Sequence, residues 1–160
     1  MLYNIIIFLQ NSVSYDNFYP IIKLSKLLTR TKSYYFYFVI LAYCDKYRLP
    51  KILIVFYTGR YINSYLKSVV KQQRPYNDYP SKIKYFKKQK QSYSFPSQSI
   101  QSIYIIYNSY KRLCSNYIID LYFWFILILL IITRLYRGLH YLHDMLFSLI
   151  LAHVLCVAAL

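Results

Sequence analysis

Two side chains near the end of the chain have the types and spacing of a nucleophile and the group that orients it. His140 and Asp144 stand four positions apart, so on a helix both lie on one face, within reach of each other. A carboxylate that accepts a hydrogen bond from one imidazole nitrogen fixes the tautomer and leaves the other nitrogen able to attack an electrophile. The pair therefore predicts nucleophilic chemistry at His140, with Asp144 in the orienting role.

Basic side chains elsewhere in the chain suit an anionic partner. Lys67 offers a point charge, and Arg74 and Arg134 offer planar forks of N–H donors, which match phosphoryl oxygens and the charge that grows on them in a transition state. Ser97 follows Pro96 at the expected start of a helix, where a hydroxyl and free backbone N–H groups can face an anion. These residues favour phosphate chemistry if the fold brings them together.

A metal site is the competing interpretation of the same region. His140, His143 and Asp144 have three- and four-residue spacings that occur among metal ligands. The basic residues around them would repel a cation, however. The sequence therefore favours a phosphate site with no metal ion and no other cofactor.

The composition indicates that the chain lies in lipid. Of its 160 residues, 58% are hydrophobic and 21% are aromatic, which is more apolar surface than an ordinary soluble domain buries. Twenty Lys and Arg against five Asp and Glu give a formal charge of +15, which suits anionic headgroups or phosphate esters. Nucleic acid is disfavoured, because the basic residues lie between apolar runs and not along one polar face. The expected partners are membrane lipids and a phosphorylated lipid substrate.

Five segments are candidates for membrane-crossing helices, each of which needs about 20 mostly apolar residues. They are residues 34–44 with their flanks, 51–70, 97–113, 117–133 and 139–160. Only the last two are cleanly apolar, so the polar residues of 51–70 and 97–113 must face a bundle interior if these segments span. Residues 71–95 form a basic loop. The sequence predicts an all-α transmembrane helical bundle of about five to six helices.

The order of these segments gathers the reactive residues at one membrane face. Lys67 and Arg74 close segment 51–70, and Ser97 opens the next segment on the same side. The chain then crosses away and back, which returns Arg134 and His140 to that side. Ionisable residues at this depth are functional candidates. We expect a helical domain over residues 34–160, preceded by an N-terminal interfacial or partial helix segment over residues 1–33.

Three spaced motifs resemble those of the type-2 phosphatidic acid phosphatase (PAP2) and vanadium haloperoxidase superfamily, in its membrane lipid phosphatase branch. The first, K-x6-RP, stands intact from Lys67 to Pro75. The third, SR-x5-H-x3-D, runs from Thr133 to Asp144 with Thr in place of Ser. The second, PSGH, corresponds to Pro96–Ser99, which reads PSQS. The resemblance covers residues 51–160 and implies a PAP2-like fold.

The resemblance also implies a role for each matching residue. His140 resembles the nucleophile that becomes a phosphohistidine, and Asp144 the residue that orients it. The phosphate-binding group would comprise Lys67, Arg74, Ser97, Gln98 and Arg134. The general acid of the family falls at Ser99, whose neutral hydroxyl is too weak an acid to protonate a leaving alkoxide. Loss of such help typically lowers the rate about 10²- to 10⁴-fold.

An integral, multi-pass membrane lipid phosphatase follows from the resemblance, acting on a lipid phosphate monoester or diphosphate through a phosphohistidine. Two alternatives stay open: a catalytically impaired pseudo-phosphatase that binds phosphorylated lipids, and a structural membrane protein. The endoplasmic reticulum or the plasma membrane is the expected location. The family implies a site that faces the lumen or exterior, whereas the Lys-rich loop 71–95 favours the cytoplasm by the positive-inside rule.

The Ser99 departure generates a prediction about the substrate. A lipid monoester expels an alkoxide that needs a proton, unless His143 or a substrate group supplies one, whereas a lipid diphosphate expels phosphate, a better leaving group. We therefore expect the purified protein to release phosphate faster from a polyprenyl diphosphate than from phosphatidic acid. Equal or greater activity on the monoester would contradict the leaving-group argument.

Overall fold

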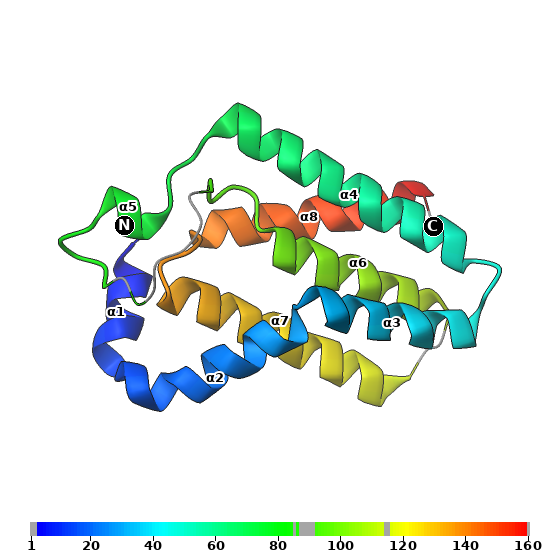
Figure 1. Cartoon of the computed structure of the whole chain (residues 1–160), viewed down its shortest axis with the longest axis horizontal. Coiled ribbons are helices and arrows are strands. Elements are labelled where there is room, and N and C mark those ends of the chain that lie inside the picture. The colour runs from blue at the N-terminus through cyan, green and yellow to red at the C-terminus, as the bar shows by residue number, and fades with distance from the viewer. Residues whose placement is uncertain (1–2, 85, 87–91, 114–115, 160) are drawn as a thin grey trace.

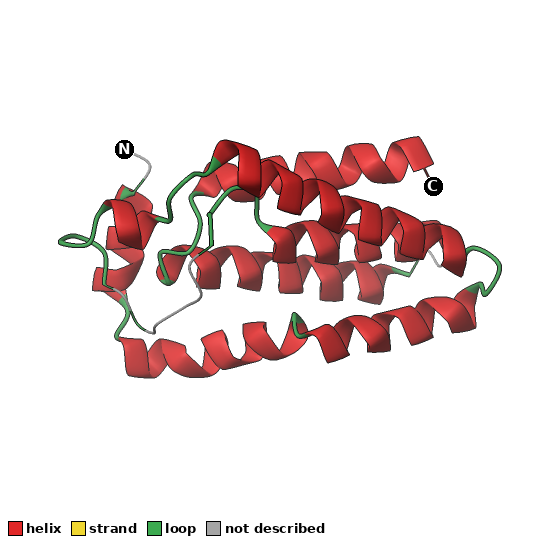
Figure 2. Cartoon of the chain, turned by 45° about the horizontal axis from the view of Figure 1, so that its top comes forward, coloured by secondary structure: helices red, strands yellow, loops and turns green. Residues whose placement is uncertain are grey.

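The structure is a computed structural model that describes residues 3–84, 86, 92–113 and 116–159, and these form an elongated helical bundle (Figures 1 and 2). The described residues contain helices, turns and loops but no strand, which confirms the all-α prediction. The helices are α1 (Asn4–Ser12), α2 (Tyr15–Leu28), α3 (Thr31–Cys44), α4 (Leu49–Val70), α5 (Pro75–Asp78), α6 (Gln98–Leu113), α7 (Tyr117–Tyr136) and α8 (Leu142–Ala159).

Helix α6 is the central element of the bundle and contacts α3, α4, α7 and α8. Its junction with α4 is polar: Asn63 Nδ2 donates to Gln101 Oε1 at 2.5 Å, and Gln101 Nε2 donates to the Gly59 carbonyl at 2.9 Å. A Cβ at position 59 would lie 2.9 Å from Ile105 Cδ1 and 3.1 Å from Gln101 Nε2, so the lack of a side chain on Gly59 allows the two helices to pack closely. The polar faces of these two segments therefore turn inward, as the sequence predicted.

The five long helices from α3 to α8 alternate in direction along the bundle (Figure 1). Contacts between their ends establish which ends meet. Arg134, near the end of α7, donates from Nη2 to Ser99 Oγ at 3.2 Å and to Thr29 Oγ1 at 3.4 Å. The Ser97 N–H donates to Ser148 Oγ of α8 at 2.7 Å. The end of α7 and the starts of α3, α6 and α8 thus share one end of the bundle.

Helices α7 and α8 are long and apolar enough to cross a membrane. Within their most apolar windows only 39% and 28% of the residues are buried inside the protein, whereas the core helix of a soluble protein would be mostly buried. Large side chains such as Phe125, Ile128 and Ile150 are more than half exposed. A membrane would cover this outward apolar surface.

The N-terminal segment packs on α7 through two helices. Gln10 Nε2 donates to the Tyr136 carbonyl at 2.7 Å, and Gln10 Oε1 accepts from the Lys84 N–H at 2.8 Å. Phe18 and Ile22 of α2 bury their side chains beside Tyr136. The sequence predicted an interfacial or partial helix segment here, and the structure contains the two helices α1 and α2. The division into residues 1–33 and 34–160 stays a prediction.

The loop expected over residues 71–95 contains one short helix, α5. Pro75 occupies its first turn, where the missing N–H and fixed φ of proline are tolerated. The Tyr76 N–H donates to the Gly138 carbonyl at 3.3 Å, and the Ser94 N–H donates to the Gln72 carbonyl at 2.8 Å. Residues 85 and 87–91 of this loop lie outside the described residues. The two bonds tie the described part to the end of α7 and to itself.

Gly138 ends α7 and directs the chain towards His140. Its φ of 61° is left-handed, the Gly138 N–H donates to the Leu135 carbonyl at 2.8 Å, and the Leu139 N–H donates to the Arg134 carbonyl at 3.0 Å. These are the two bonds of a Schellman motif. A Cβ at position 138 would lie 2.8 Å from Ile83 Cγ2, so both conformation and space require glycine.

We expect Gly138→Ala to lower the free energy of unfolding by about 1–2 kcal/mol from the left-handed conformation alone, with a further loss from the contact with Ile83. Thermal unfolding in detergent measures the change. Because Ile83 is buried, the difference between Gly138→Ala with Ile83→Ala and Ile83→Ala alone gives the conformational part. An unchanged unfolding temperature for the single variant would contradict the assigned role.

Candidate active site

His140 lies in the connector between α7 and α8 and not on a helix. Helix α8 begins at Leu142, two residues later, so the expectation that His140 and Asp144 share a helical face is wrong. The physical reason is the Schellman turn at Gly138, which ends α7 before His140 is reached. The connector nevertheless places His140 Nδ1 3.6 Å from Asp144 Oδ2. This distance allows electrostatic attraction but exceeds that of a hydrogen bond.

The carboxylate of Asp144 is fully buried and contacts three groups. Its Oδ2 accepts from the Tyr141 N–H at 2.9 Å, which is half of a capping box at the start of α8. Its Oδ1 lies 3.0 Å from His143 Nε2. Asp144 thus fixes the first turn of α8 while it lies between two imidazoles, those of His140 and His143.

The imidazole of His140 is buried beside several positive charges. Burial lowers its pKa to about 4, and the charges of Arg74, Lys67 and Arg134 act in the same direction, against the influence of Asp144. The charges of all three cations therefore act on the same ring. His140 is therefore neutral at physiological pH, which is the form that can act as a nucleophile.

Arg74 and Lys67 reach the site from the end of α4 and the loop that follows. Arg74 Nε donates to the Ser92 carbonyl at 2.7 Å, and Arg74 Nη2 donates to Ser92 Oγ at 2.6 Å. Arg74 Nη1 donates to the Leu139 carbonyl at 3.4 Å, next to His140. Both the guanidinium and the connector are thereby held in place.

The ammonium of Lys67 supports the turn that precedes α6. It donates to the carbonyls of Tyr93, Ser94 and Pro96 at 3.0, 3.3 and 2.7 Å. An ammonium has three N–H donors, so these three hydrogen bonds use all of the donors of Lys67. Lys67 acts on His140 through its charge and on Ser97 through the position of the turn.

The start of α6 contributes Ser97, Gln98 and Ser99. The Ser97 N–H is not free as the sequence suggested, because it donates to Ser148 Oγ at 2.7 Å. Gln98 is half-buried in the first turn. Ser99 Oγ accepts a hydrogen bond from Arg134 Nη2 at 3.2 Å, so the residue that replaces the expected His contacts a member of the predicted phosphate-binding group.

Four buried polar atoms that have no hydrogen-bond partner within the described residues belong to this site. They are Ser97 Oγ, Arg134 Nε, His140 Nδ1 and Asp144 Oδ1, of which the last two approach an ionic partner, at 3.6 and 3.0 Å, without forming a hydrogen bond. Buried polar atoms are rarely left unpaired in proteins, and donors such as the Ser97 hydroxyl and Arg134 Nε suit anionic oxygens. Among the described residues no group of three or more His, Cys, Asp or Glu side chains is arranged to hold a metal ion.

Several residues that support the site were not predicted from the sequence. Ser148 is fully buried, accepts from the Ser97 N–H and donates to the Asp144 carbonyl at 2.6 Å. Ser148 stands four residues after Asp144, and this spacing was the signal available in the sequence. Thr29 and Gln72 gave no such signal, because they meet Arg134 and His143 only through the tertiary fold.

Comparisons with known proteins identify the family. The family model of the PAP2 superfamily matches residues 48–160, so the chain belongs to this superfamily. No curated protein matches the chain. Among solved structures, it is similar to the first transmembrane PAP2 type phosphatidylglycerolphosphate phosphatase from Bacillus subtilis, with a TM-score of 0.69 and 21% sequence identity over 88% of this chain and 73% of that one. The fold is PAP2-like, and the chain is a membrane protein.

The environment of His140 leads to a prediction about its titration. Because its pKa is lowered from 6.5 to about 4, its imidazole should remain neutral at pH 5, where an ordinary His is mostly protonated. Arg74→Met removes one positive charge and should raise the pKa towards 6.5. Histidine ¹⁵N shifts, assigned with His140→Gln, measure both.

Arg60→Met is the matched control, because Arg60 carries the same charge nearer the middle of α4. It should leave the pKa of His140 unchanged. Titration of His140 at pH 6.5 or above in the unmodified protein would contradict the buried, cation-flanked environment.

Proposed function

We propose that this protein is an integral membrane phosphohydrolase that removes phosphate from a phosphorylated lipid through a phosphohistidine at His140. The observation that carries the proposal is the environment of that ring, which is neutral, buried, beside Asp144 and surrounded by the charges of Arg74, Lys67 and Arg134. Membership of the PAP2 superfamily supports the reaction class. The neighbour of known structure carries the name of a lipid phosphate phosphatase.

The reaction would proceed in two displacements at phosphorus. A ring nitrogen of His140 attacks and forms the N–P bond, while the bond to the leaving oxygen breaks and its electron pair leaves with that oxygen. Water then attacks the phosphorus and loses a proton to solvent, while the N–P bond breaks and its electron pair returns to the ring nitrogen. Inorganic phosphate is released and neutral His140 is regenerated. Arg74, Arg134 and the Ser97 hydroxyl would hold the phosphoryl oxygens, and their charge would be most stabilising in the transition state.

Asp144 would act by position and charge. A cationic phosphohistidine beside a buried carboxylate is stabilised relative to one in an apolar site. The 3.6 Å separation between His140 and Asp144 would shorten as positive charge appears on the ring, because hydrogen bonds at active sites often tighten in the reacting complex. Asp144 is held in position by two hydrogen bonds: Ser148 Oγ donates to its backbone carbonyl, and the Tyr141 N–H donates to its Oδ2.

The proton for a leaving alkoxide would come from His143, because Ser99 cannot supply it. His143 is half-buried beside the site, and its ring stacks on Tyr141 with centroids 5.3 Å apart. Its Nε2 lies 3.0 Å from Asp144 Oδ1 and 2.9 Å from Gln72 Nε2, which holds the ring beside Asp144. A lipid diphosphate would need this proton less, and it remains the favoured substrate class.

The membrane arrangement is part of the proposal. Helices α3, α4, α6, α7 and α8 would cross the bilayer, which makes the protein multi-pass, with the endoplasmic reticulum or plasma membrane as its location. Exposed apolar residues on α4 support this, among them Ile54 and Tyr57. Helices α3 and α6 are shorter than a full span. Helix α2, which directly precedes α3, would lengthen the bundle on that side and lie at the membrane–water interface.

A pseudo-phosphatase that binds the phosphorylated headgroup without turnover is the second candidate. Two observations favour it: Ser99 replaces the expected general acid, and the donors of Lys67 are occupied by backbone carbonyls. Binding would then depend on Arg74 and Arg134, while phosphate release would be absent in the unmodified protein.

Phosphate release from a panel of lipid monoesters and diphosphates tests the proposal. We expect His140→Ala to lower release by at least about a thousandfold, because the nucleophile is lost. His153→Ala is the matched control, since His153 is an exposed histidine of α8, about 14 Å further along the helix than Asp144, and it should retain activity. Vanadate should inhibit the wild type, since it mimics the phosphoryl transition state in this family.

The same panel assigns the proton donor. His143→Gln should lower monoester hydrolysis about a hundredfold and diphosphate hydrolysis much less, because only the alkoxide needs a proton. If the wild type binds the headgroup but releases no phosphate, and Arg74→Ala abolishes that binding, the protein is a pseudo-phosphatase and not an enzyme. Full activity of His140→Ala would exclude His140 as the nucleophile.

A further inference from the structure

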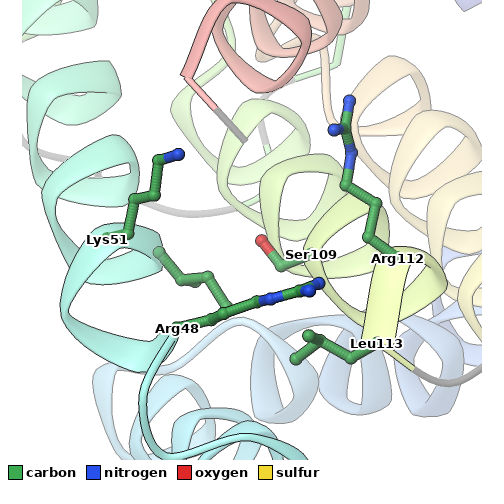
Figure 3. A pocket seen from close by; sticks show the side chains of 6 residues that line it. Arg48, Lys51, Ser109, Arg112 and Leu113 are labelled. Atoms are coloured by element: carbon green, nitrogen blue, oxygen red, sulfur yellow. The ribbon is translucent and has the colours of Figure 1, made fainter.

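A cavity lies at the end of the bundle opposite His140. It has a volume of about 300 Å³ and lies between the start of α4 and the end of α6 (Figure 3). Its lining residues are Arg48, Lys51, Ile52, Ser109, Arg112 and Leu113. None of the residues that match the PAP2 motifs is among them, so the predicted phosphatase site does not account for this cavity.

The lengths of two helices separate this cavity from the active site. Along α4, Lys51 and Lys67 are separated by about 24 Å at 1.5 Å per residue. Along α6, Ser97 and Arg112 are separated by about 22 Å on the same basis. Because the two helices run in opposite directions, both estimates place the cavity at the other face of the bundle. One ligand cannot occupy both sites.

The cavity concentrates positive charge from two helices. Arg48 and Lys51 lie at the start of α4, Arg112 lies near the end of α6, and all three line the cavity (Figure 3). Like charges held together repel one another, and none of the described lining residues is acidic. Asp45 forms an ion pair with Arg48, at 3.3 Å between Nε and Oδ2, and so offsets one of the three charges. The remaining excess suits a small anion.

The uncharged residues that line the cavity restrict which kinds of anion it can bind. The Ser109 hydroxyl donates to the Ile105 carbonyl at 2.8 Å. The hydrogen bonds that the protein donates to a ligand in this cavity therefore come from the cationic side chains. Ile52 is buried and, with Leu113, forms an apolar side. Donors on one side and an apolar wall on the other match a charged headgroup that enters from an apolar phase.

Exposed tyrosines occur together with exposed cations at this end of the bundle, a combination typical of the membrane surface. Tyr43 at the end of α3 is 94% exposed, Tyr47 in the turn before α4 is 84% exposed, and Tyr117 at the start of α7 is 74% exposed. Exposed tyrosines in membrane proteins collect at the headgroup level. Arginine and lysine at the same level extend towards phosphate groups. The cavity therefore opens where lipid headgroups are available.

We propose that this cavity binds the phosphate of an anionic membrane lipid in the leaflet opposite the active site. The ligand chemistry is a phosphate oxyanion held by Lys51, Arg112 and Arg48, with the lipid's glycerol region against Ile52 and Leu113. The site is distinct from the phosphatase centre and does not depend on whether that centre turns over substrate. It would anchor α4 to α6 at the end remote from His140.

Lipid binding in neutral detergent tests the assignment, because no charged membrane surface contributes there. The probe is phosphatidylserine, a phosphodiester that offers no terminal phosphate to the proposed reaction, compared with phosphatidylcholine by native mass spectrometry. We expect Lys51→Gln with Arg112→Gln to lower phosphatidylserine affinity at least about tenfold, since two charge-assisted contacts are lost. Arg112→Lys should retain most of the affinity, because it keeps the charge.

A matched double variant controls for net charge. Lys46→Gln with Lys111→Gln removes two charges at the same end of the bundle outside the cavity and should leave the affinity within about twofold. All changed side chains are exposed, and unchanged helix content and gel-filtration profile establish that the variants fold.

Three outcomes would overturn the proposal. An equal loss in both double variants would mean that charge alone attracts the lipid. Loss of binding in Arg74→Ala with retention in the cavity variant would assign the lipid to the active site. Binding of inorganic phosphate without binding of phosphatidylserine would assign the cavity to a soluble anion. None of these readouts requires phosphatase activity, so failure here and failure of the proposed function are distinguishable.

Discussion

Mutual repulsion among cations is the constraint around which one end of this bundle is built. Lys67, Arg74 and Arg134 all act on the buried ring of His140, and like charges in a medium of low polarity repel strongly. The fold opposes this repulsion with backbone carbonyls and hydroxyls. Lys67 is held by three carbonyls, and Arg74 by Ser92 and the connector at Leu139. A bound phosphate would complete the balance of charge.

Helix ends supply most of the remaining positioning. The Schellman turn at Gly138 stops α7 and releases His140 from helical geometry, and the Asp144 carboxylate caps the start of α8. Ser148 then joins that first turn to the start of α6. The same local devices that terminate helices thus set the distances between the reactive groups, because the site lies where helices begin and end.

The two ends of the bundle differ in how they treat positive charge. At the His140 end Arg74 is buried, Lys67 and Arg134 are half-buried, and all three are held by hydrogen bonds. At the Arg48 end the cations are exposed around an open cavity. The long helices between them carry a polar seam, where Asn63, Gln101 and Gly59 meet, and an apolar outer surface. This division suits a protein that faces a polar surface at each end and hydrocarbon between.

Much of this protein was determined by local sequence. The apolar runs fixed α7 and α8, since a span needs a length of apolar residues that few other structures use. The alternation of helices then placed Lys67, Arg74, Ser97, Arg134 and His140 at one end without knowledge of any contact. The motif spacing from Lys67 to Pro75 and from Thr133 to Asp144 led to the PAP2 superfamily.

The tertiary structure decided what spacing cannot encode. The four-residue spacing of His140 and Asp144 suggested that both lie on one helical face. Instead, the left-handed Gly138 ends α7 and places His140 in a connector. The end of α7 depends on the space beside Ile83 as well as on the local sequence. The support of Arg134 by Thr29, the occupation of Lys67 by carbonyls, and the cavity at Arg48 and Arg112 all join residues distant in the chain. Such contacts arise only when helices pack, since each partner is chosen by geometry across the bundle and carries no local signal.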